Sequence, residues 1–204
     1  MFSTNDTIVA IATPPGRGAI GVVRLSGPHA QDIASQLLRI QRPLPPRLAT
    51  LARLSAHGVS DDVVATFFPG PRSYTGDDVL ELSAHGSDAV LHAIVEAAVA
   101  RGARLARPGE FTLRAYLNGK LDLVQAEAVA DLIEAATPLQ ARAAFEQLDG
   151  TLTAALAGID QALFELEAEL EASVDFPDEG YHFIDPPTLI ARLRSITAGV
   201  GALL

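Results

Sequence analysis

Residues 7–25, which read TIVAIATPPGRGAIGVVRL, decide how the chain begins to fold. Two apolar runs, 7–12 and 20–25, have the length and composition of buried strands. The prolines and glycines of 13–18 fit neither a helix nor a central strand, because proline lacks an amide proton and both residues interrupt regular backbone. The stretch therefore predicts two strands joined by a rigid loop.

The remainder of the first half alternates between strand-like and helix-like segments. Strands are expected at 48–57, 62–68, 79–82 and 104–107, with a turn at 58–61. Helices are expected at 29–39, at 87–101 with Ser87 as N-cap, and from Pro108-Gly109-Glu110 to a stop at Asn118-Gly119. This order predicts an α+β domain, in which helices pack on a mixed sheet.

The second half has the pattern of consecutive helices. Asp122 and Gln125 resemble a capping box that starts one helix, and Thr137-Pro138 starts another. Apolar residues then recur every three or four positions, as on one long helix, at Leu148, Leu152, Leu156, Ile159, Leu163, Leu166 and Leu170. The segment 175–180 breaks that helix, and another begins after Pro186-Pro187. Such an apolar seam has to be buried against other helices, so we expect an incomplete all-α domain that further sequence or a partner completes.

The composition excludes several chemistries. The 204 residues include no cysteine, which rules out disulfides, cysteine-ligated zinc and thiol nucleophiles within the chain. No run approaches the ~18 apolar residues that cross a bilayer, and the first residues lack the basic start of a secretory signal. The histidines show no metal-ligand spacing, and no G-x-x-x-x-G-K-S/T phosphate loop is present. We therefore expect a cytoplasmic protein without a metal site.

Charge is distributed unevenly over a chain whose net charge is −10. Residues 1–118 hold eleven Arg and ten acidic residues, whereas 119–204 hold one Lys, three Arg and fifteen acidic residues. This asymmetry predicts two domains that meet near Asn118-Gly119. Nucleic acid, if bound, is expected on the first half, because acidic helices repel phosphates. A simpler interpretation stays open, in which the acidic helices are merely well solvated.

The segment Gly16-Arg17-Gly18-Ala19-Ile20-Gly21 matches the G-x-G-x-x-G pattern of dinucleotide-binding folds. Such folds require a helix after the glycines and an acidic residue ~20 positions later, and the sequence offers neither. A glycine-rich connection between two strands is the preferred interpretation. Another stays open, in which the loop amides and Arg17 approach an anionic ligand.

Three charged residues are candidates for a binding site. Glu81 lies within the strand-like run 79–82, where a carboxylate on an apolar face requires a partner. It either faces solvent at an edge or accepts from a ligand with adjacent N–H donors, such as an amino-oxo heterocycle. Arg24 lies near the end of its strand, where a solvated role is the simpler interpretation. Lys120, the only lysine, follows the predicted helix stop, so its amine can project from a turn.

Several blocks of sequence resemble the N-terminal region of the MnmE family, also called TrmE, of tRNA modification GTPases. They are DTIVA at 6–10, TPPGRG at 13–18, YTGDDVLE at 74–81 and RPGEFTLRA at 107–115. NGKLDLVQAEA at 118–128 and DFPDE at 175–179 resemble the family's helical region. The resemblance covers nearly the whole chain, with the blocks in the family's order.

The resemblance implies an α+β domain at 1–118, similar to the folate-binding domains of aminomethyltransferases, and the first part of a helical domain at 119–204. It implies that the first domain forms a homodimer and binds 5-formyltetrahydrofolate, or a related tetrahydrofolate, through Arg24, Glu81 and Lys120. The family's GTPase domain, which uses GTP, magnesium and potassium, is inserted into the helical domain and is expected to follow Leu204. Full-length members act with an FAD-dependent protein, MnmG, to build an aminomethyl-type group on the wobble uridine of tRNA.

We therefore expect the chain to bind folate and to dimerise, with no catalytic residues of its own and no GTP hydrolysis. The alternative is a ligand-free dimerisation scaffold that positions GTPase domains or tRNA. A stand-alone aminomethyltransferase is disfavoured, because the sequence offers no second domain for a protein-bound substrate. No membrane partner is expected.

Overall fold

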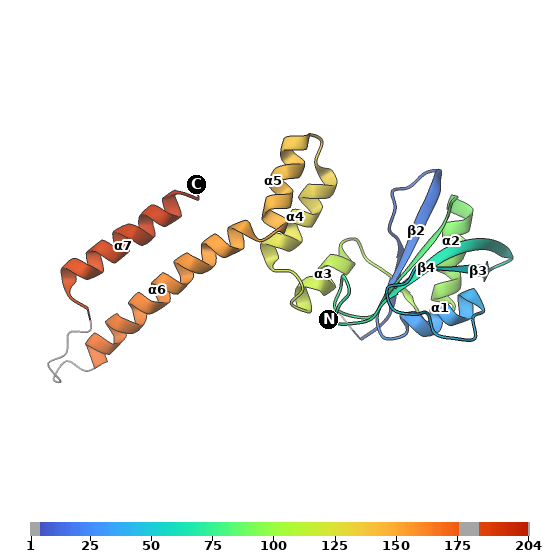
Figure 1. Cartoon of the computed structure of the whole chain (residues 1–204), viewed down its shortest axis with the longest axis horizontal. Coiled ribbons are helices and arrows are strands. Elements are labelled where there is room, and N and C mark those ends of the chain that lie inside the picture. Colours follow the sequence, from blue (N-terminus) through green and yellow to red (C-terminus); the bar gives the residue numbers. More distant parts are fainter. Residues whose placement is uncertain (1–4, 176–183, 204) are drawn as a thin grey trace. The chain divides into compact units, whose positions relative to one another are not determined.

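The structure is a computed structural model that describes residues 5–175 and 184–203 (Figure 1). The chain divides into two compact units, one that ends at Ala126 and one that begins at Glu127. Arg24, Glu81 and Lys120 therefore belong to the same unit.

A six-stranded sheet is the framework of the first unit. Its strands are β1 (Ile8–Ile11), β2 (Gly18–Ser26), β3 (Thr50–Ala56), β4 (Val59–Phe68), β5 (Val79–Gly86) and β6 (Arg104–Leu105). They lie in the order β3-β4-β5-β2-β1-β6, and neighbours are antiparallel except β1 and β6, which run parallel. The mixed sheet with its helices confirms the predicted α+β class.

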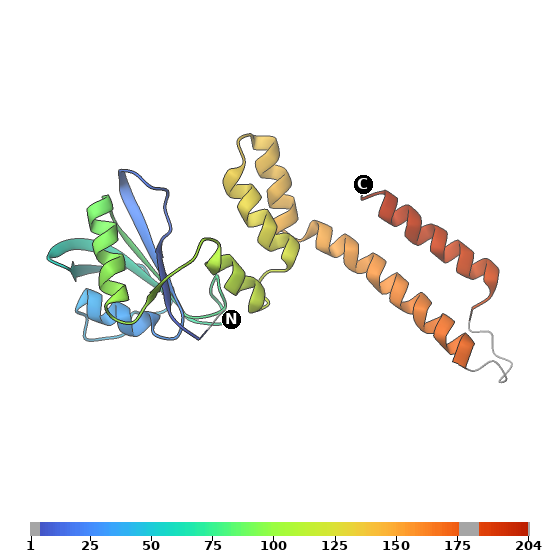
Figure 2. The same cartoon turned by 180° about the vertical axis from the view of Figure 1, so that it is seen from behind.

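Two helices, α1 (Ala30–Leu38) and α2 (Asp88–Val99), bury their apolar sides against one face of this sheet (Figures 1 and 2). Successive side chains of a strand point to opposite faces, so every second strand residue faces the helices. The buried residues between the layers include Val9, Val23, Leu25, Leu54, Leu80, Leu82, Ile33, Leu37, Leu91 and Ile94. Arg24 and Glu81 alternate with these strand residues and therefore lie on the opposite face of the sheet.

The connection between β3 and β4 is shorter than predicted. Ala56 pairs with Val59, so His57 and Gly58 alone form the turn, and the predicted turn at 58–61 is wrong. The φ angles of His57 and Gly58 are 43° and 82°. Positive φ at both central residues is the geometry of the tightest hairpin turns, and it lets β4 begin at Val59.

Two other local predictions concern the residues that flank strands. β1 and β2 are antiparallel neighbours, with Ile11 opposite Val23. The glycine-rich segment between them is therefore a hairpin connection, as preferred, and the dinucleotide-binding arrangement is excluded because it requires a helix there. Ser87 precedes α2 as predicted, but its side chain makes no capping hydrogen bond.

A cluster of four charged side chains ties the start of α3 (Glu110–Leu117) to the segment before β1. Glu110 and Arg114, one helical turn apart, expose only 2% and 1% of their surfaces. Arg104 donates to Oε1 of Glu110 at 2.6 Å and to Oδ2 of Asp6 at 2.7 Å. Arg114 forms ion pairs with both carboxylates. Two arginines and two carboxylates thus neutralise one another where α3 begins.

This cluster makes the folded state sensitive to acid. The hydrogen bond from Arg104 lowers the pKa of Glu110 from 4.5 to about 2. Although burial acts to raise it, the bonds from Arg104 and Arg114 leave the pKa of Asp6 below its ordinary value. A lowered pKa stabilises the folded state above the unfolded pKa, and that stabilisation disappears as the pH falls through the folded pKa.

We therefore expect the free energy of unfolding to fall between about pH 4.5 and about pH 2. Protonation of Glu110 removes at most about 3 kcal/mol, because one pKa unit corresponds to about 1.4 kcal/mol. Urea unfolding followed by circular dichroism at several pH values measures this loss. A free energy that stays constant across the window would contradict the assigned ion pairs.

Further helices follow α3 in the described residues. They are α4 (Leu123–Glu134), α5 (Pro138–Leu148), α6 (Thr151–Asp175) and α7 (Pro186–Gly201). The predicted capping box before α4 is confirmed, because the side chains of Asp122 and Gln125 each accept from the other's amide, at 2.8 and 3.0 Å. Thr137 caps α5 in the same way, with Gln140 as its partner.

The predicted single long helix is wrong in one respect. Leu148 ends α5, and Asp149-Gly150 separates it from α6. Gly150 has a φ of 86°, a left-handed conformation that ends a helix. The seam from Leu152 to Leu170 does lie on α6, which ends at Asp175, whereas 176–180 lie outside the described residues. None of the helices in the described ranges is long and apolar enough to cross a bilayer.

Candidate functional site

Arg24 and Glu81 form an ion pair across two neighbouring strands. Arg24 of β2 lies directly opposite Glu81 of β5, so the two side chains project from the same face of the sheet. Nε and Nη2 of Arg24 donate to Oε1 of Glu81 at 2.9 and 2.7 Å. Their side chains remain 27% and 31% exposed. The sheet register therefore fixes a charge pair that a ligand can still reach.

Two aromatic rings flank the guanidinium group of Arg24. Its Cζ lies 5.2 Å from the ring centroid of Tyr74 and 5.8 Å from that of Phe111, both within cation–π range. Tyr74 belongs to the loop before β5, and Phe111 belongs to the first turn of α3. Within the described residues, Oε2 of Glu81 accepts no hydrogen bond, and that oxygen is left for a ligand.

Hydrogen bonds hold the loop that carries Tyr74. The Tyr74 hydroxyl lies 2.9 Å from Oγ1 of Thr112, which ties the loop to α3. The Thr75 and Ser26 hydroxyls, both buried, lie 2.7 Å apart, which ties the loop to β2. Nδ2 of Asn118 donates to the carbonyl of Thr75 at 2.7 Å. The aromatic ring beside Arg24 is therefore positioned from two sides.

Lys120 is positioned by the way α3 ends. Gly119 has a φ of 67°, and the amide of Lys120 donates to the carbonyl of Ala115 at 2.8 Å. This Schellman-type ending confirms the predicted helix stop. A Cβ added to Gly76 would lie 3.4 Å from Cγ of Lys120, so the lysine stem runs beside the Tyr74 loop. The exposed Lys120 side chain forms no ion pair with the described part of the chain.

The structure thus brings two of the three candidate residues into direct contact and places the third beside the same loop. Tyr74 and Phe111 were not among the residues predicted for this site. They occur in the blocks quoted above at 74–81 and 107–115, but those blocks do not indicate that both rings contact Arg24. Both rings contact Arg24 because the chain folds back on itself, and local sequence does not encode that contact.

This arrangement suits a flat, polar ring that carries an acidic substituent. A free carboxylate oxygen accepts N–H donors strongly, since one partner is charged. The rings of Tyr74 and Phe111 offer faces for stacking. Lys120 adds a mobile positive charge that attracts carboxylates or phosphates without demanding one geometry.

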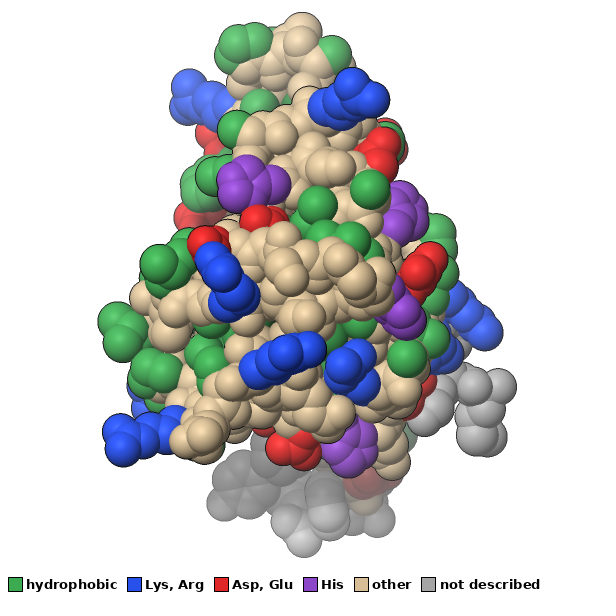
Figure 3. All heavy atoms as spheres, turned by 90° about the vertical axis from the view of Figure 1, so that its right-hand side faces the viewer, with side chains coloured by type: hydrophobic (Ala, Val, Ile, Leu, Met, Phe, Trp, Pro, Cys, Tyr) green, Lys and Arg blue, Asp and Glu red, His purple; other side chains and the backbone are tan. Residues whose placement is uncertain are grey.

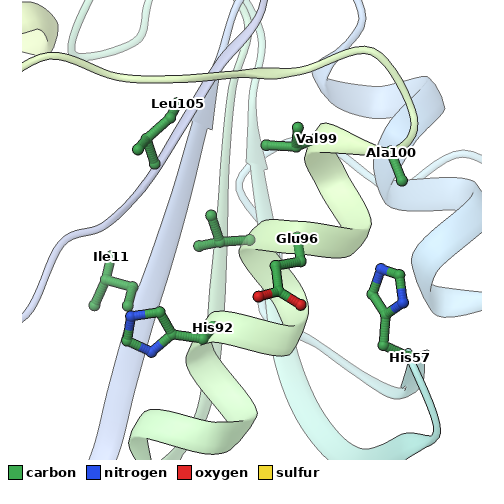
Figure 4. Close-up of a pocket in the computed structure, with 8 residues that line it drawn as sticks. Ile11, His57, His92, Glu96, Val99, Ala100 and Leu105 are labelled. Carbon is green, nitrogen blue, oxygen red and sulfur yellow. The ribbon is translucent and has the colours of Figure 1, made fainter.

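A larger hollow lies elsewhere in the unit, along α2. The cavity measures about 670 Å³ and is lined mainly by apolar side chains, with His57, His92 and Glu96 beside them (Figure 4). None of the three candidate residues lines it. Within the described ranges, no three His, Asp or Glu side chains are grouped so that they could hold a metal ion. The charged site is therefore identified by its contacts and not by cavity size.

A smaller cavity of about 260 Å³ lies beside the glycine-rich loop, where residues 13–18 line it together with Gly86 and Leu91. A Cβ added to Gly21 would lie 2.5 Å from Cδ1 of Leu91, so this part of β2 packs directly on α2. The cavity is therefore on the helix-covered side of the sheet, opposite Arg24. An anionic ligand at this loop stays a prediction that is separate from the Arg24 site.

Two family models match the chain in succession. The model described as "GTP-binding protein TrmE N-terminus" matches residues 7–120, and the model described as "MnmE helical domain" matches residues 123–204. The fold and these matches define the class, an α+β N-terminal domain followed by the helical domain of a tRNA modification GTPase. The chain belongs to the MnmE (TrmE) family.

Curated relatives carry the same name over the same region. The protein of Azoarcus sp. (strain BH72), named tRNA modification GTPase MnmE, is 50% identical over 201 residues, which cover 98% of this chain and 44% of the relative. Proteins of that name from Koribacter versatilis (strain Ellin345) and Legionella pneumophila (strain Philadelphia 1) are 48% and 47% identical, over 96% and 94% of this chain. The chain spans less than half the length of these relatives.

Proposed function

We propose that the first unit binds a formylated tetrahydrofolate through Arg24, Glu81 and Lys120, as part of a tRNA modification GTPase. The observation that carries this proposal is the Arg24–Glu81 pair, which the sheet fixes on its open face beside two aromatic rings. The bound folate would supply a one-carbon group for the modification.

Each residue has a distinct part in this proposal. Oε2 of Glu81, which is free of protein donors in the described residues, accepts from the amino and N–H edge of the pterin. Arg24 donates to the other oxygen, Oε1, and so orients the Glu81 carboxylate. Lys120 faces the anionic glutamate tail, where a point charge is sufficient. Tyr74 and Phe111 provide apolar faces for the pterin ring.

The activity of the whole protein is proposed from its relatives, which are named tRNA modification GTPases. In this proposal, GTP, magnesium and potassium bind a GTPase domain outside the present sequence, which contains no Walker A pattern. The whole protein acts in the cytoplasm with an FAD-dependent partner of the MnmG type on the wobble uridine of tRNA. The role of the present chain is to bind folate and to dimerise.

The open face of the sheet is the proposed dimer surface. Leu51 of β3 is 75% exposed, and Val64, opposite it on β4, is 38% exposed. Ile20 of β2, on the same face as Arg24, is 67% exposed. Large apolar side chains on one face favour burial against another protein, and a two-fold dimer lets the same patch meet itself. In this proposal, the folate site lies close to the subunit contact.

We expect Leu51→Glu to weaken the dimer by about tenfold or more, because the new carboxylate would be buried without a partner. Analytical ultracentrifugation over a concentration series measures the dissociation constant. Leu105→Glu is the matched control, since Leu105 is 59% exposed and lines the α2 cavity on the other face. If the dimer resists Leu51→Glu but dissociates with Leu105→Glu, the subunit contact lies on the helix-covered face of the sheet and the proposed dimer surface is wrong.

A ligand-free scaffold is the second candidate function, since the same exposed face would serve dimerisation alone. Calorimetric titration with 5-formyltetrahydrofolate separates the two. Saturable binding at one site per subunit supports the folate proposal. A protein that dimerises, releases no heat on titration and retains no folate in equilibrium dialysis supports the scaffold.

A further inference from the structure

A second surface of the first unit is rich in arginine and poor in acid. The 28 residues between Asp32 and Asp61 include four arginines and no aspartate or glutamate. Arg53, one of the four, is paired with Asp62 at 2.9 Å. The other three, Arg39, Arg42 and Arg47, are exposed and have no carboxylate partner among the residues described.

These three arginines lie on the connection between α1 and β3, which is anchored at several points. Leu44, at its middle, is only 2% exposed, and its carbonyl accepts from Nε2 of Gln31 at 3.3 Å. The amide of Arg47 donates to the carbonyl of Phe67 at 2.7 Å. Arg39 and Arg47 both have positive φ, at 50° and 57°, which anchored backbone can sustain. The arginines therefore project from a held backbone, so less entropy is lost when they bind.

A fourth arginine comes from a different loop. The guanidinium group of Arg47 donates to the backbone carbonyl of Arg72, in the loop between β4 and β5. This bond brings the backbone of Arg72 next to Arg47, and the exposed Arg72 side chain has no carboxylate partner in the described ranges. The acids of that loop are Asp77 and Asp78, which directly precede β5, and Asp78 accepts from the amide of Gly70 at 2.9 Å. Figure 3, which looks onto the side where Figure 1 labels β3 and α1, shows basic side chains spread over that face, with acidic side chains among them.

Exposed guanidinium groups that have no carboxylate partner remain available to anions. Arginine suits phosphate groups, because its planar donors match two phosphate oxygens. Asp32, in the first turn of α1, is the one acidic residue on that helix, and it lies seven positions, about two helical turns, before Arg39. The acidic excess of the chain lies instead beyond residue 118. The arginine loops therefore lie in the part of the sequence that lacks this acidic excess.

We propose that Arg39, Arg42, Arg47 and Arg72 form a contact surface for the sugar-phosphate backbone of RNA. The proposal rests on the proposed function, because it takes tRNA as the substrate, and it names the surface of the first unit that holds it. The contact is independent of base sequence, since it consists of charge pairs to phosphates. The folate site uses none of these arginines, although Arg72 lies on the same loop as Tyr74.

The test uses the whole chain and a tRNA transcript, with binding measured by fluorescence anisotropy between 50 and 200 mM KCl. Each phosphate contact contributes about 0.7–0.9 to the slope of log K against log salt. Arg42→Gln/Arg72→Gln removes one charge from each loop and no hydrogen bond made by a described side chain. We expect this double variant to lower the slope by about 1.5 and to weaken binding about tenfold or more at 100 mM KCl.

The matched control is Arg53→Gln/Asp62→Asn, which removes an arginine from the same acid-free stretch together with its partner and keeps the net charge. It should change neither slope nor affinity. The proposal is wrong if the unmodified chain does not bind tRNA at 50 mM KCl, if both double variants lose the same affinity, or if polyglutamate of equal charge competes as well as RNA. Folate titration of the Arg42→Gln/Arg72→Gln protein should be unchanged, so a failure of the folate proposal is recognised independently.

Discussion

Replacing Glu110 by Ala is expected to lower the free energy of unfolding of the first unit by about 3–5 kcal/mol. Glu110 is buried with Arg114, and Arg104 donates to it as well. Without Glu110, the two arginines share the Asp6 carboxylate alone, and removal of one partner from a buried charge network costs more than the pair itself contributes. Most folded domains have only about 5–15 kcal/mol of total stability, so this loss is a large fraction of the total. Urea unfolding followed by circular dichroism measures the loss.

The matched control is Asp62→Ala. Asp62 also pairs with an arginine on two atoms, but both side chains are more than half exposed. Exposed ion pairs contribute little, because water screens them in both states. We therefore expect the unfolding midpoint of the control to stay near that of the parent protein. Equal midpoints for the two variants would show that the four-charge cluster at the start of α3 does not stabilise the fold.

Glu81→Gln is expected to reduce the affinity for 5-formyltetrahydrofolate at least about a hundredfold. The change keeps the size of the side chain but removes its charge, and it replaces one acceptor oxygen by a donor nitrogen. A ligand N–H would then face a poor acceptor or a donor, and a buried donor without a partner costs about 1–3 kcal/mol. Two such donors account for the expected factor, since each 1.4 kcal/mol is tenfold. Calorimetric titration measures the dissociation constant directly.

Glu96→Gln is the control for that experiment. Glu96 is an exposed residue of α2 that lines the larger cavity, on the other face of the sheet. The Glu96→Gln protein should bind folate like the parent protein. If Glu96→Gln loses folate binding and Glu81→Gln retains it, the ligand binds in the cavity along α2 and not beside Glu81. Since the Glu81 side chain is only partly buried, the Glu81→Gln protein should stay folded, which circular dichroism checks.

Local signals in the sequence predicted most of the elements. Alternating or continuous apolar runs identified the strands, and Asn118-Gly119 predicted the ending of α3 that positions Lys120. The capping residues Asp122 and Thr137 correctly marked two helix starts. These features could be predicted because each depends on residues within one or two turns of chain.

Contacts between distant segments were not predictable in the same way. Arg24 and Glu81 are 57 positions apart, and their pairing depends on the register of β2 against β5. A shift of one residue would send one side chain to the other face. The aromatic neighbours Tyr74 and Phe111 reach Arg24 from two further segments. The break between α5 and α6 was missed because leucine spacing continues across Gly150, whose left-handed backbone ends the helix.

The measurement that tests the central claim most directly is a crystal structure of the chain with 5-formyltetrahydrofolate bound. The folate account predicts the pterin edge within hydrogen-bond distance of Oε2 of Glu81, its ring against Tyr74 or Phe111, and the glutamate tail near Lys120. Folate bound in the cavity along α2, or crystals grown at saturating folate that show none beside Arg24 and Glu81, would contradict it.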